Sequence, residues 1–119
     1  MLCAVIDMGA NTIRLSIYSV ENEVVKQLVN KKETAGLFSY VENGTMSKAG
    51  MVKGCLVLEN FQDILRNLKI TNLYVFATAS LRNISNTQEA TDFIRARTGI
   101  CVEVLSGEEE ARLGFVAVS

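Results

Sequence analysis

The chain of 119 residues has no histidine, only three cysteines and almost no net charge. Without histidine, Ser-His-Asp and Cys-His arrangements and His-based zinc sites are excluded, so acid–base chemistry falls to carboxylates, lysine or tyrosine. Cys3, Cys55 and Cys101 are far apart, lie in apolar segments and show no Cys-x-x-Cys spacing. We expect them to be buried free thiols rather than catalytic or metal-binding groups.

The charge balance and the lack of long apolar runs exclude two kinds of partner. Twelve basic and thirteen acidic side chains give a net charge of −1, and the basic residues are scattered. Double-stranded nucleic acid is a poor candidate, because neutralising its phosphates usually requires a basic stripe. No apolar run reaches the roughly 18 to 20 residues that cross a bilayer, and no signal peptide is recognisable. We expect a single cytoplasmic domain over residues 1–119, without a membrane partner.

Apolar periodicity predicts an α/β domain with the element order βββαβαβα. The predicted strands cover residues 2–8, 13–18, 23–34, 72–78 and 100–105. The predicted helices begin at Ser47, near Ser85 or Asn86, and at Ser106, and the second of them ends at Gly99. A tight turn is expected at Glu21-Asn22, and a loop over residues 35–46. This order is that of a ribonuclease H-like half domain, with a mixed five-stranded sheet and helices on its faces.

Three consecutive carboxylates open the last predicted helix, and helix geometry gives each a different environment. Ser106 and Glu109 fit a capping box, in which each side chain accepts a hydrogen bond from the other residue's backbone N–H. Glu108 lies four residues before Arg112, a favourable order for a surface ion pair. Neither arrangement involves Glu110.

Glu110 is the candidate general base. Its neighbours at helical spacing are Leu113, Gly114 and Ala117. An apolar surrounding disfavours the charged form of a carboxylate, so its pKa rises and it becomes a better proton acceptor. Equally compatible with the sequence is that all three acids complement the positive end of the helix dipole.

The segment between the first two strands has the composition of a phosphate-binding loop. Gly9 allows a positive φ and leaves room for a ligand, while Asn11, Thr12 and the loop N–H groups offer hydrogen bonds to phosphate oxygens. Asp7 is an oxygen ligand suited to hydrated Mg²⁺. The alternative, commoner for so short a motif, is a hairpin in which the glycine and asparagine serve only the turn.

A second candidate loop follows the predicted strand over residues 72–78. Thr78 and Ser80 supply hydroxyl groups, and Arg82 supplies a guanidinium fork suited to phosphate oxygens. Arg14 points from the second strand toward the first loop. For both arginines a solvated surface position is the commoner explanation.

The three motifs together resemble the N-terminal domain of the exopolyphosphatase and guanosine-pentaphosphate phosphohydrolase (Ppx/GppA) family. They are Asp-x-Gly-x-Asn-Thr, Ala-Thr-Ala-Ser-x-Arg-Asn and Ser-Gly-Glu-Glu-Glu-Ala-Arg-Leu. The last motif is specific to the family, and the first is shared with actin, Hsp70 and sugar kinases of the same superfamily. The resemblance implies hydrolysis of a terminal phosphoanhydride of polyphosphate or guanosine pentaphosphate, with Mg²⁺, in a cleft between two ribonuclease H-like domains.

Carried onto matching positions, the resemblance gives roles to single residues. Glu110 would activate the attacking water, and Arg82 would bind the terminal phosphates. The residues of the first loop would be Gly9, Asn11 and Thr12, with Asp7 near the metal. The family's second phosphate loop and second domain lie beyond Ser119, so we expect the partner of this chain to be the rest of the parent enzyme, and the chain alone to be inactive.

Two other readings stay open. A sugar or acyl kinase of the same superfamily would need the first loop but not the Glu110 motif. A non-catalytic domain that binds polyphosphate or guanosine polyphosphates would need the loops but no base. The sequence decides neither the preferred substrate nor whether an exposed interdomain face promotes a homodimer.

Overall fold

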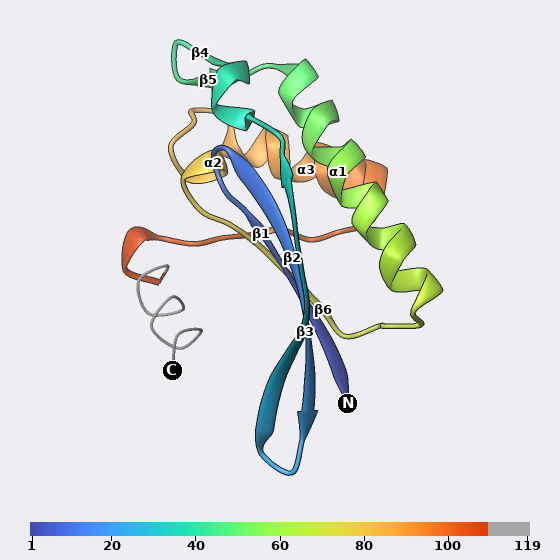
Figure 1. The fold of residues 1–119 in the computed structure, drawn as a ribbon. Coiled ribbons are helices and arrows are strands. Elements are labelled where there is room, and N and C mark those ends of the chain that lie inside the picture. The colour runs from blue at the N-terminus through green and yellow to red at the C-terminus, as the bar shows by residue number, and fades with distance from the viewer. Residues whose placement is uncertain (110–119) are drawn as a thin grey trace.

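A mixed five-stranded sheet forms the centre of the fold in the computed structural model, which describes residues 1–109 (Figure 1). Its spatial order is β3-β2-β1-β6-β7, with antiparallel β3/β2 and β2/β1 pairs and parallel β1/β6 and β6/β7 pairs. The strands are β1 (Leu2–Met8), β2 (Thr12–Glu21), β3 (Val24–Thr34), β6 (Leu73–Ala77) and β7 (Glu103–Val104). The predicted α/β half domain with a mixed sheet is confirmed.

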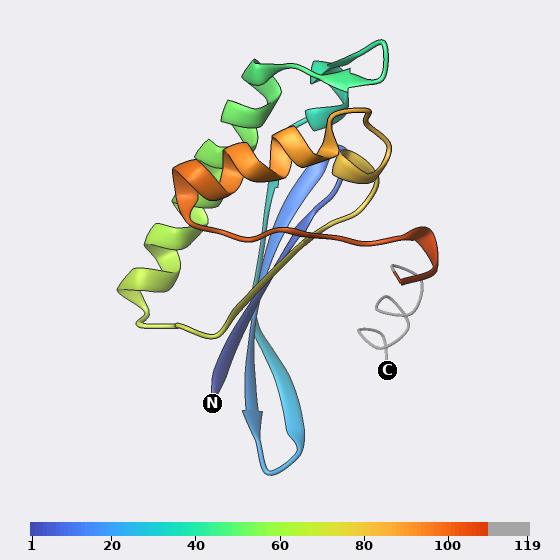
Figure 2. The same cartoon turned by 180° about the vertical axis from the view of Figure 1, so that it is seen from behind.

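Two helices, α1 (Lys48–Asn67) and α3 (Thr87–Thr98), pack against each other on one face of the sheet (Figures 1 and 2). Between this face and the helices lies the hydrophobic core, whose burial is the main favourable term in folding. Its fully buried side chains include Ile6, Leu15, Leu58, Phe61 and Ile94. Among residues 1–109, no helix combines the length and apolar character needed to cross a membrane.

The predicted helix ends are largely confirmed. Ser47 caps α1, because its hydroxyl accepts a hydrogen bond from Gly50 N at 3.2 Å. Gly99 ends α3 in the left-handed conformation with φ 79°, which glycine adopts without steric cost. Asn86 precedes α3 but makes no side-chain cap; its amide binds elsewhere, as described below.

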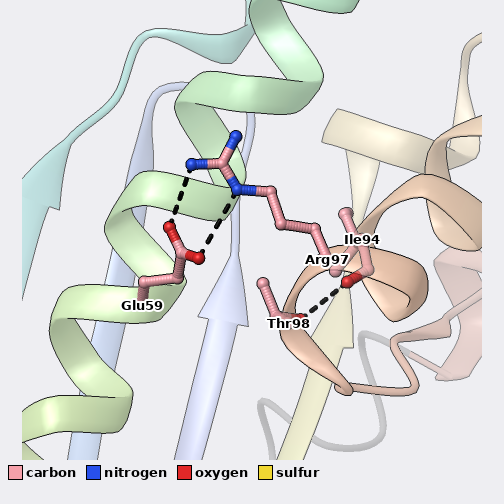
Figure 3. A network of polar contacts seen from close by, with 4 residues as sticks. All are labelled: Glu59, Ile94, Arg97 and Thr98. Carbon is pink, nitrogen blue, oxygen red and sulfur yellow. Dashed lines mark hydrogen bonds and ion pairs between the residues drawn. The ribbon is translucent and has the colours of Figure 1, made fainter.

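An ion pair joins the two helices at their outer surface (Figure 3). The guanidinium of Arg97 on α3 donates to both carboxylate oxygens of Glu59 on α1, at 3.2 and 3.4 Å. In the last turn of α3, the Thr98 hydroxyl donates to the carbonyl of Ile94 at 2.7 Å. The ion pair thus joins α1 to α3, whereas the Thr98 bond lies within α3.

The expectation of three buried thiols is only partly correct. Cys55 on α1 is buried, Cys3 is half-buried and Cys101 is exposed. Burial raises the pKa of the Cys55 thiol, an effect that nearby Arg97 partly offsets. Cys101 is exposed because the predicted strand over residues 100–105 is shorter than expected: only Glu103–Val104 pairs with β6.

Three local predictions are wrong. The tight turn lies at Asn22-Glu23, with φ of 49° and 66°, rather than at Glu21-Asn22. The predicted loop over residues 35–46 contains a 3-10 helix, η1 (Leu37–Tyr40), and a hairpin of β4 (Val41–Glu42) and β5 (Thr45–Met46). The segment after β6 contains a one-turn helix, α2 (Ala79–Arg82). Elements this short show no periodicity that a sequence pattern can detect.

Candidate functional site

Three chain segments follow the carboxyl ends of the parallel strands β1, β6 and β7. We call them the first segment (residues 7–12), the second segment (77–83) and the third segment (105–109). Since parallel strands end at the same edge of a sheet, motifs far apart in sequence reach one region. Open α/β sheets bind ligands at this edge.

Glycine is required at position 9 for a reason other than the one predicted. Gly9 is not among the positive-φ residues, so the prediction that it uses a positive φ is wrong. A Cβ at this position would lie 2.9 Å from the carbonyl oxygen of Thr12, the group that accepts the Gly9 N–H at 2.9 Å. The tight closure of the loop excludes any side chain there.

The first segment is held from outside by the chain leading into η1. Gly36 N donates to Asn11 O at 2.8 Å, and Phe38 N donates to Ala10 O at 2.9 Å. With these two carbonyls engaged, the loop is fixed before any ligand binds. The sequence contains no signal for this contact.

Asp7 lies in β1 and is the first residue of the first segment. The sheet register places it opposite Phe76 on β6 and Arg14 on β2, and its carboxylate oxygen Oδ1 is buried. Arg14 is exposed and lies opposite Lys32 on β3. Because Arg14 pairs with Asp7 in the sheet, it lies next to the first segment, as predicted.

The carbonyl of Met8 joins the second segment to the first. Ser80, whose residue is only 4% exposed, donates its hydroxyl to Met8 O at 2.5 Å, and Thr78 N donates to the same oxygen at 3.3 Å. Thr78 is buried as well. The two residues that the sequence marks for their hydroxyl groups therefore take part in joining the two segments.

The third segment is joined to the second by its first residue, Leu105. Leu105 N donates to Ala77 O at 2.9 Å, and Arg82 Nη1 donates to Leu105 O at 3.3 Å. The predicted capping box follows directly and is confirmed. Glu109 N donates to Ser106 Oγ at 3.1 Å, and Ser106 N donates to Glu109 Oε1 at 3.1 Å.

Two predictions for the last helix lie outside the described residues. They are the environment of Glu110 and the pairing of Glu108 with Arg112. The structure thus brings together the first segment, the second segment with Arg82, and the start of the carboxylate motif. The catalytic, phosphate-binding and metal-binding roles of these residues stay predictions.

The side chains at this edge of the sheet indicate which kind of metal ion could bind there. Within residues 1–109, no group of three or more histidine, cysteine or acidic side chains could surround a metal ion. Asp7 supplies a single carboxylate with a buried oxygen. Mg²⁺ commonly takes one or two carboxylates and completes its shell with water and substrate phosphates, so Asp7 fits such an ion better than a metal that needs a full protein cage.

Comparisons with known proteins agree with the motifs. The model of the Ppx/GppA phosphatase family matches residues 16–119. The chain is 28% identical over 120 residues to exopolyphosphatase 1 of Mycobacterium tuberculosis, covering 99% of this chain and 35% of that protein. It is 29% identical over 117 residues to guanosine-5'-triphosphate,3'-diphosphate pyrophosphatase of Aliivibrio fischeri, covering 98% of this chain and 24% of that protein.

Solved structures show the same fold. An exopolyphosphatase from Cytophaga hutchinsonii matches with a TM-score of 0.87 at 32% identity, over 95% of this chain and 36% of that one. The Aquifex aeolicus member of the Ppx/GppA family matches with a TM-score of 0.90, over 99% of this chain and 39% of that one. The Aquifex aeolicus protein is only 24% identical in sequence, so this match shows a common fold and nothing more. The chain spans about a quarter to two fifths of the length of these relatives.

Proposed function

Because the chain belongs to the Ppx/GppA phosphatase family, we propose that it forms the N-terminal part of a phosphoanhydride hydrolase. The substrate is inorganic polyphosphate or guanosine pentaphosphate, and the product is orthophosphate. One observation carries the proposal: three motifs far apart in sequence are joined by hydrogen bonds at one edge of the sheet.

Each segment has a proposed role. Gly9, Asn11 and Thr12 form the first phosphate loop, and Arg82 binds the terminal phosphates. The remaining proposed phosphate-binding residues are Arg14, Thr78 and Ser80; because the Ser80 hydroxyl already donates to Met8 O, Ser80 would bind phosphate through its backbone N–H. In phosphoryl transfer, charge spreads over the transferred oxygens, so fixed N–H groups and guanidinium groups provide most of the stabilisation. The bonds that fix the first segment from η1 and the second segment support such a prearranged site.

Glu110 is the proposed general base. The confirmed capping box engages Glu109, which gives that carboxylate a structural role and agrees with Glu110 as the proposed base. Glu110 takes a proton from the attacking water as the water oxygen bonds to the terminal phosphorus and the phosphoanhydride bond breaks.

Mg²⁺ is the proposed cofactor, and Asp7 is the described residue that would hold it. When bound, the ion supplies positive charge to the phosphate oxygens. Within this chain, the role of Asp7 is to present one carboxylate at the carboxyl end of β1, beside the first phosphate loop.

The proposed partner is the rest of the parent protein, since the chain spans 35% of its exopolyphosphatase relative. The resemblance to the family implies that a second phosphate loop belongs to that part. We therefore expect purified residues 1–119 to release negligible orthophosphate, whatever the substrate. Measurable Mg²⁺-dependent release of orthophosphate from polyphosphate by these residues alone would contradict this.

The test uses the full-length parent with two matched variants. Glu110→Gln removes the base, and we expect kcat to fall by about 10²-fold or more while substrate affinity stays near that of the wild type. Glu109→Gln is the control, because glutamine also completes a capping box, and its kcat should stay close to wild type. Unchanged turnover in Glu110→Gln would refute the base assignment.

The same assays separate the other readings. Consumption of ATP with a sugar or a carboxylate, without release of orthophosphate from polyphosphate, would indicate a kinase. Tight binding of polyphosphate or guanosine pentaphosphate by a wild-type parent that turns over neither would indicate a non-catalytic domain.

A further inference from the structure

The side chain of Arg82 reaches from α2 to the third segment. Its Nη1 donates to the carbonyl oxygen of Leu105 at 3.3 Å, across 23 positions of sequence. Arg82 is half-buried, so this bond is shielded in part from competing water. The residue expected to bind phosphate thus also contacts the chain just before the carboxylate motif.

Leu105 is fixed on both sides of its backbone. Its N–H donates to Ala77 O at 2.9 Å, its carbonyl accepts from Arg82, and its side chain is only 2% exposed. The capping box of Ser106 and Glu109 begins at the next residue. Because the box makes the turn rigid, the placement of Leu105 determines the placement of the residues up to Glu109.

We propose that Arg82 is a positioning residue as well as a phosphate ligand. By holding the Leu105 carbonyl, it sets the distance between the carboxylate-bearing segment and the phosphate loops. This inference rests on the proposed function, since it acts through Glu110 as the base.

Arginine suits this double role for a geometric reason. The guanidinium is planar and carries five N–H donors in a rigid fork, so one donor can serve a carbonyl while others face a phosphate. Lysine has a compact ammonium on a flexible stem and holds no such fixed geometry. A substrate bound by Arg82 is thereby linked to the segment that carries the base.

The decisive experiment is a double-mutant cycle of Arg82→Lys and Glu110→Gln in the full-length parent. Lysine keeps the charge but not the fork, so we expect kcat to fall by about 10-fold or more with KM changed by less than about 3-fold. In the Glu110→Gln background, Arg82→Lys should lower the residual kcat by a clearly smaller factor than in wild type, because the part of its effect that passes through the base is lost and only its contact with phosphate still acts. Equal effects in both backgrounds, or an effect confined to KM, would overturn the inference.

A second readout does not depend on activity. Amide hydrogen exchange of the parent should be faster at Ser106 and Glu109 in Arg82→Lys than in wild type, by about 10-fold or more. The matched control is Ser80→Ala, which removes a side-chain bond from α2 to a different partner, Met8 O, and should leave these two amides unchanged. Unchanged exchange in Arg82→Lys would overturn the inference.

The two readouts keep the proposals apart. If the wild-type parent releases no orthophosphate, the proposed function fails, while the exchange comparison still decides whether Arg82 holds the third segment. If the parent is active but the cycle is additive, the function stands and the positioning role fails.

Discussion

The side-chain amide of Asn86 pairs with both backbone groups of Met46, as a neighbouring strand would. Asn86 Nδ2 donates to Met46 O at 3.0 Å, and Met46 N donates to Asn86 Oδ1 at 3.0 Å. Ser85 N donates to Gly44 O at 2.7 Å in the same contact. The β4–β5 hairpin continues from η1, which holds the first segment, so Asn86 ties this support to the start of α3.

Loss of the Asn86 amide should destabilise the fold. We expect Asn86→Ala to lower the free energy of unfolding by about 2 kcal/mol, since two partly buried hydrogen bonds to Met46 are lost. Asn86→Asp keeps an acceptor for Met46 N but has no donor for Met46 O, so its cost should be similar. Urea unfolding measures both, with exposed Asn60→Ala on α1 as the control, expected to change stability by less than about 0.5 kcal/mol. Equal stability of Asn86→Ala and Asn60→Ala would contradict the prediction.

A methyl group at position 9 should disturb the first segment. Its Cβ would lie 2.9 Å from the Thr12 carbonyl, so we expect Gly9→Ala to cost about 1–3 kcal/mol of stability and to weaken phosphate binding by the parent. Gly107→Ala is the matched control, because a Cβ there meets no described atom within 4 Å. Thermal unfolding of both variants is the measurement, and a Gly9→Ala variant as stable as Gly107→Ala would show the close contact to be unimportant.

The capping box should respond differently to substitution at its two ends. Ser106→Ala removes the acceptor of the Glu109 N–H and should cost about 1 kcal/mol. Glu109→Gln should be nearly neutral, because glutamine can still accept the Ser106 N–H. Denaturant unfolding of the two variants measures their free energies of unfolding. A larger loss of stability in Glu109→Gln than in Ser106→Ala would contradict the prediction.

The ion pair between Glu59 and Arg97 should contribute little. Its side chains are 37% and 35% exposed, and exposed pairs are typically worth about 1 kcal/mol or less. A double-mutant cycle with Glu59→Gln and Arg97→Gln should give a coupling energy in that range, decreasing at high salt. A coupling of several kcal/mol that is insensitive to salt would be contrary to this expectation.

Tyr74 should make a small contribution to the loss of stability at alkaline pH, because the residue is 38% exposed and solvent screens part of the effect. Burial and the hydrogen bond that its hydroxyl donates to Glu103 at 2.7 Å raise the pKa of Tyr74 from 10.0 to about 12. Folding thus favours the protonated phenol, and this contribution is fully present below about pH 10 and lost as pH rises through about 12. Tyr74→Phe should flatten the stability profile over that range and remove a late step from the ultraviolet titration; an unchanged profile would refute the assignment.

The sequence alone determined the parts of the molecule that depend on neighbours in the chain. The cap at Ser47, the left-handed end at Gly99 and the box of Ser106 and Glu109 follow from contacts within four residues, so local patterns predict them. Apolar periodicity likewise predicted the order of the five sheet strands and the two long helices, but not the short elements η1, β4, β5 and α2. Three motifs together indicated the family. Gly9 was identified correctly as a special position, although for the wrong reason.

Only the tertiary structure decided which polar groups meet across the fold. The Ser80 hydroxyl finds the Met8 carbonyl 72 positions away, and the Asn86 amide finds Met46 40 positions away. A hydroxyl, amide or guanidinium has many acceptable partners, and nothing in its neighbours along the chain says which one the sheet will bring within reach. The contacts of α2 with β6, and of the β4–β5 hairpin with the residues before α3, decide which groups meet. A buried polar group is stable only when it finds a hydrogen-bond partner.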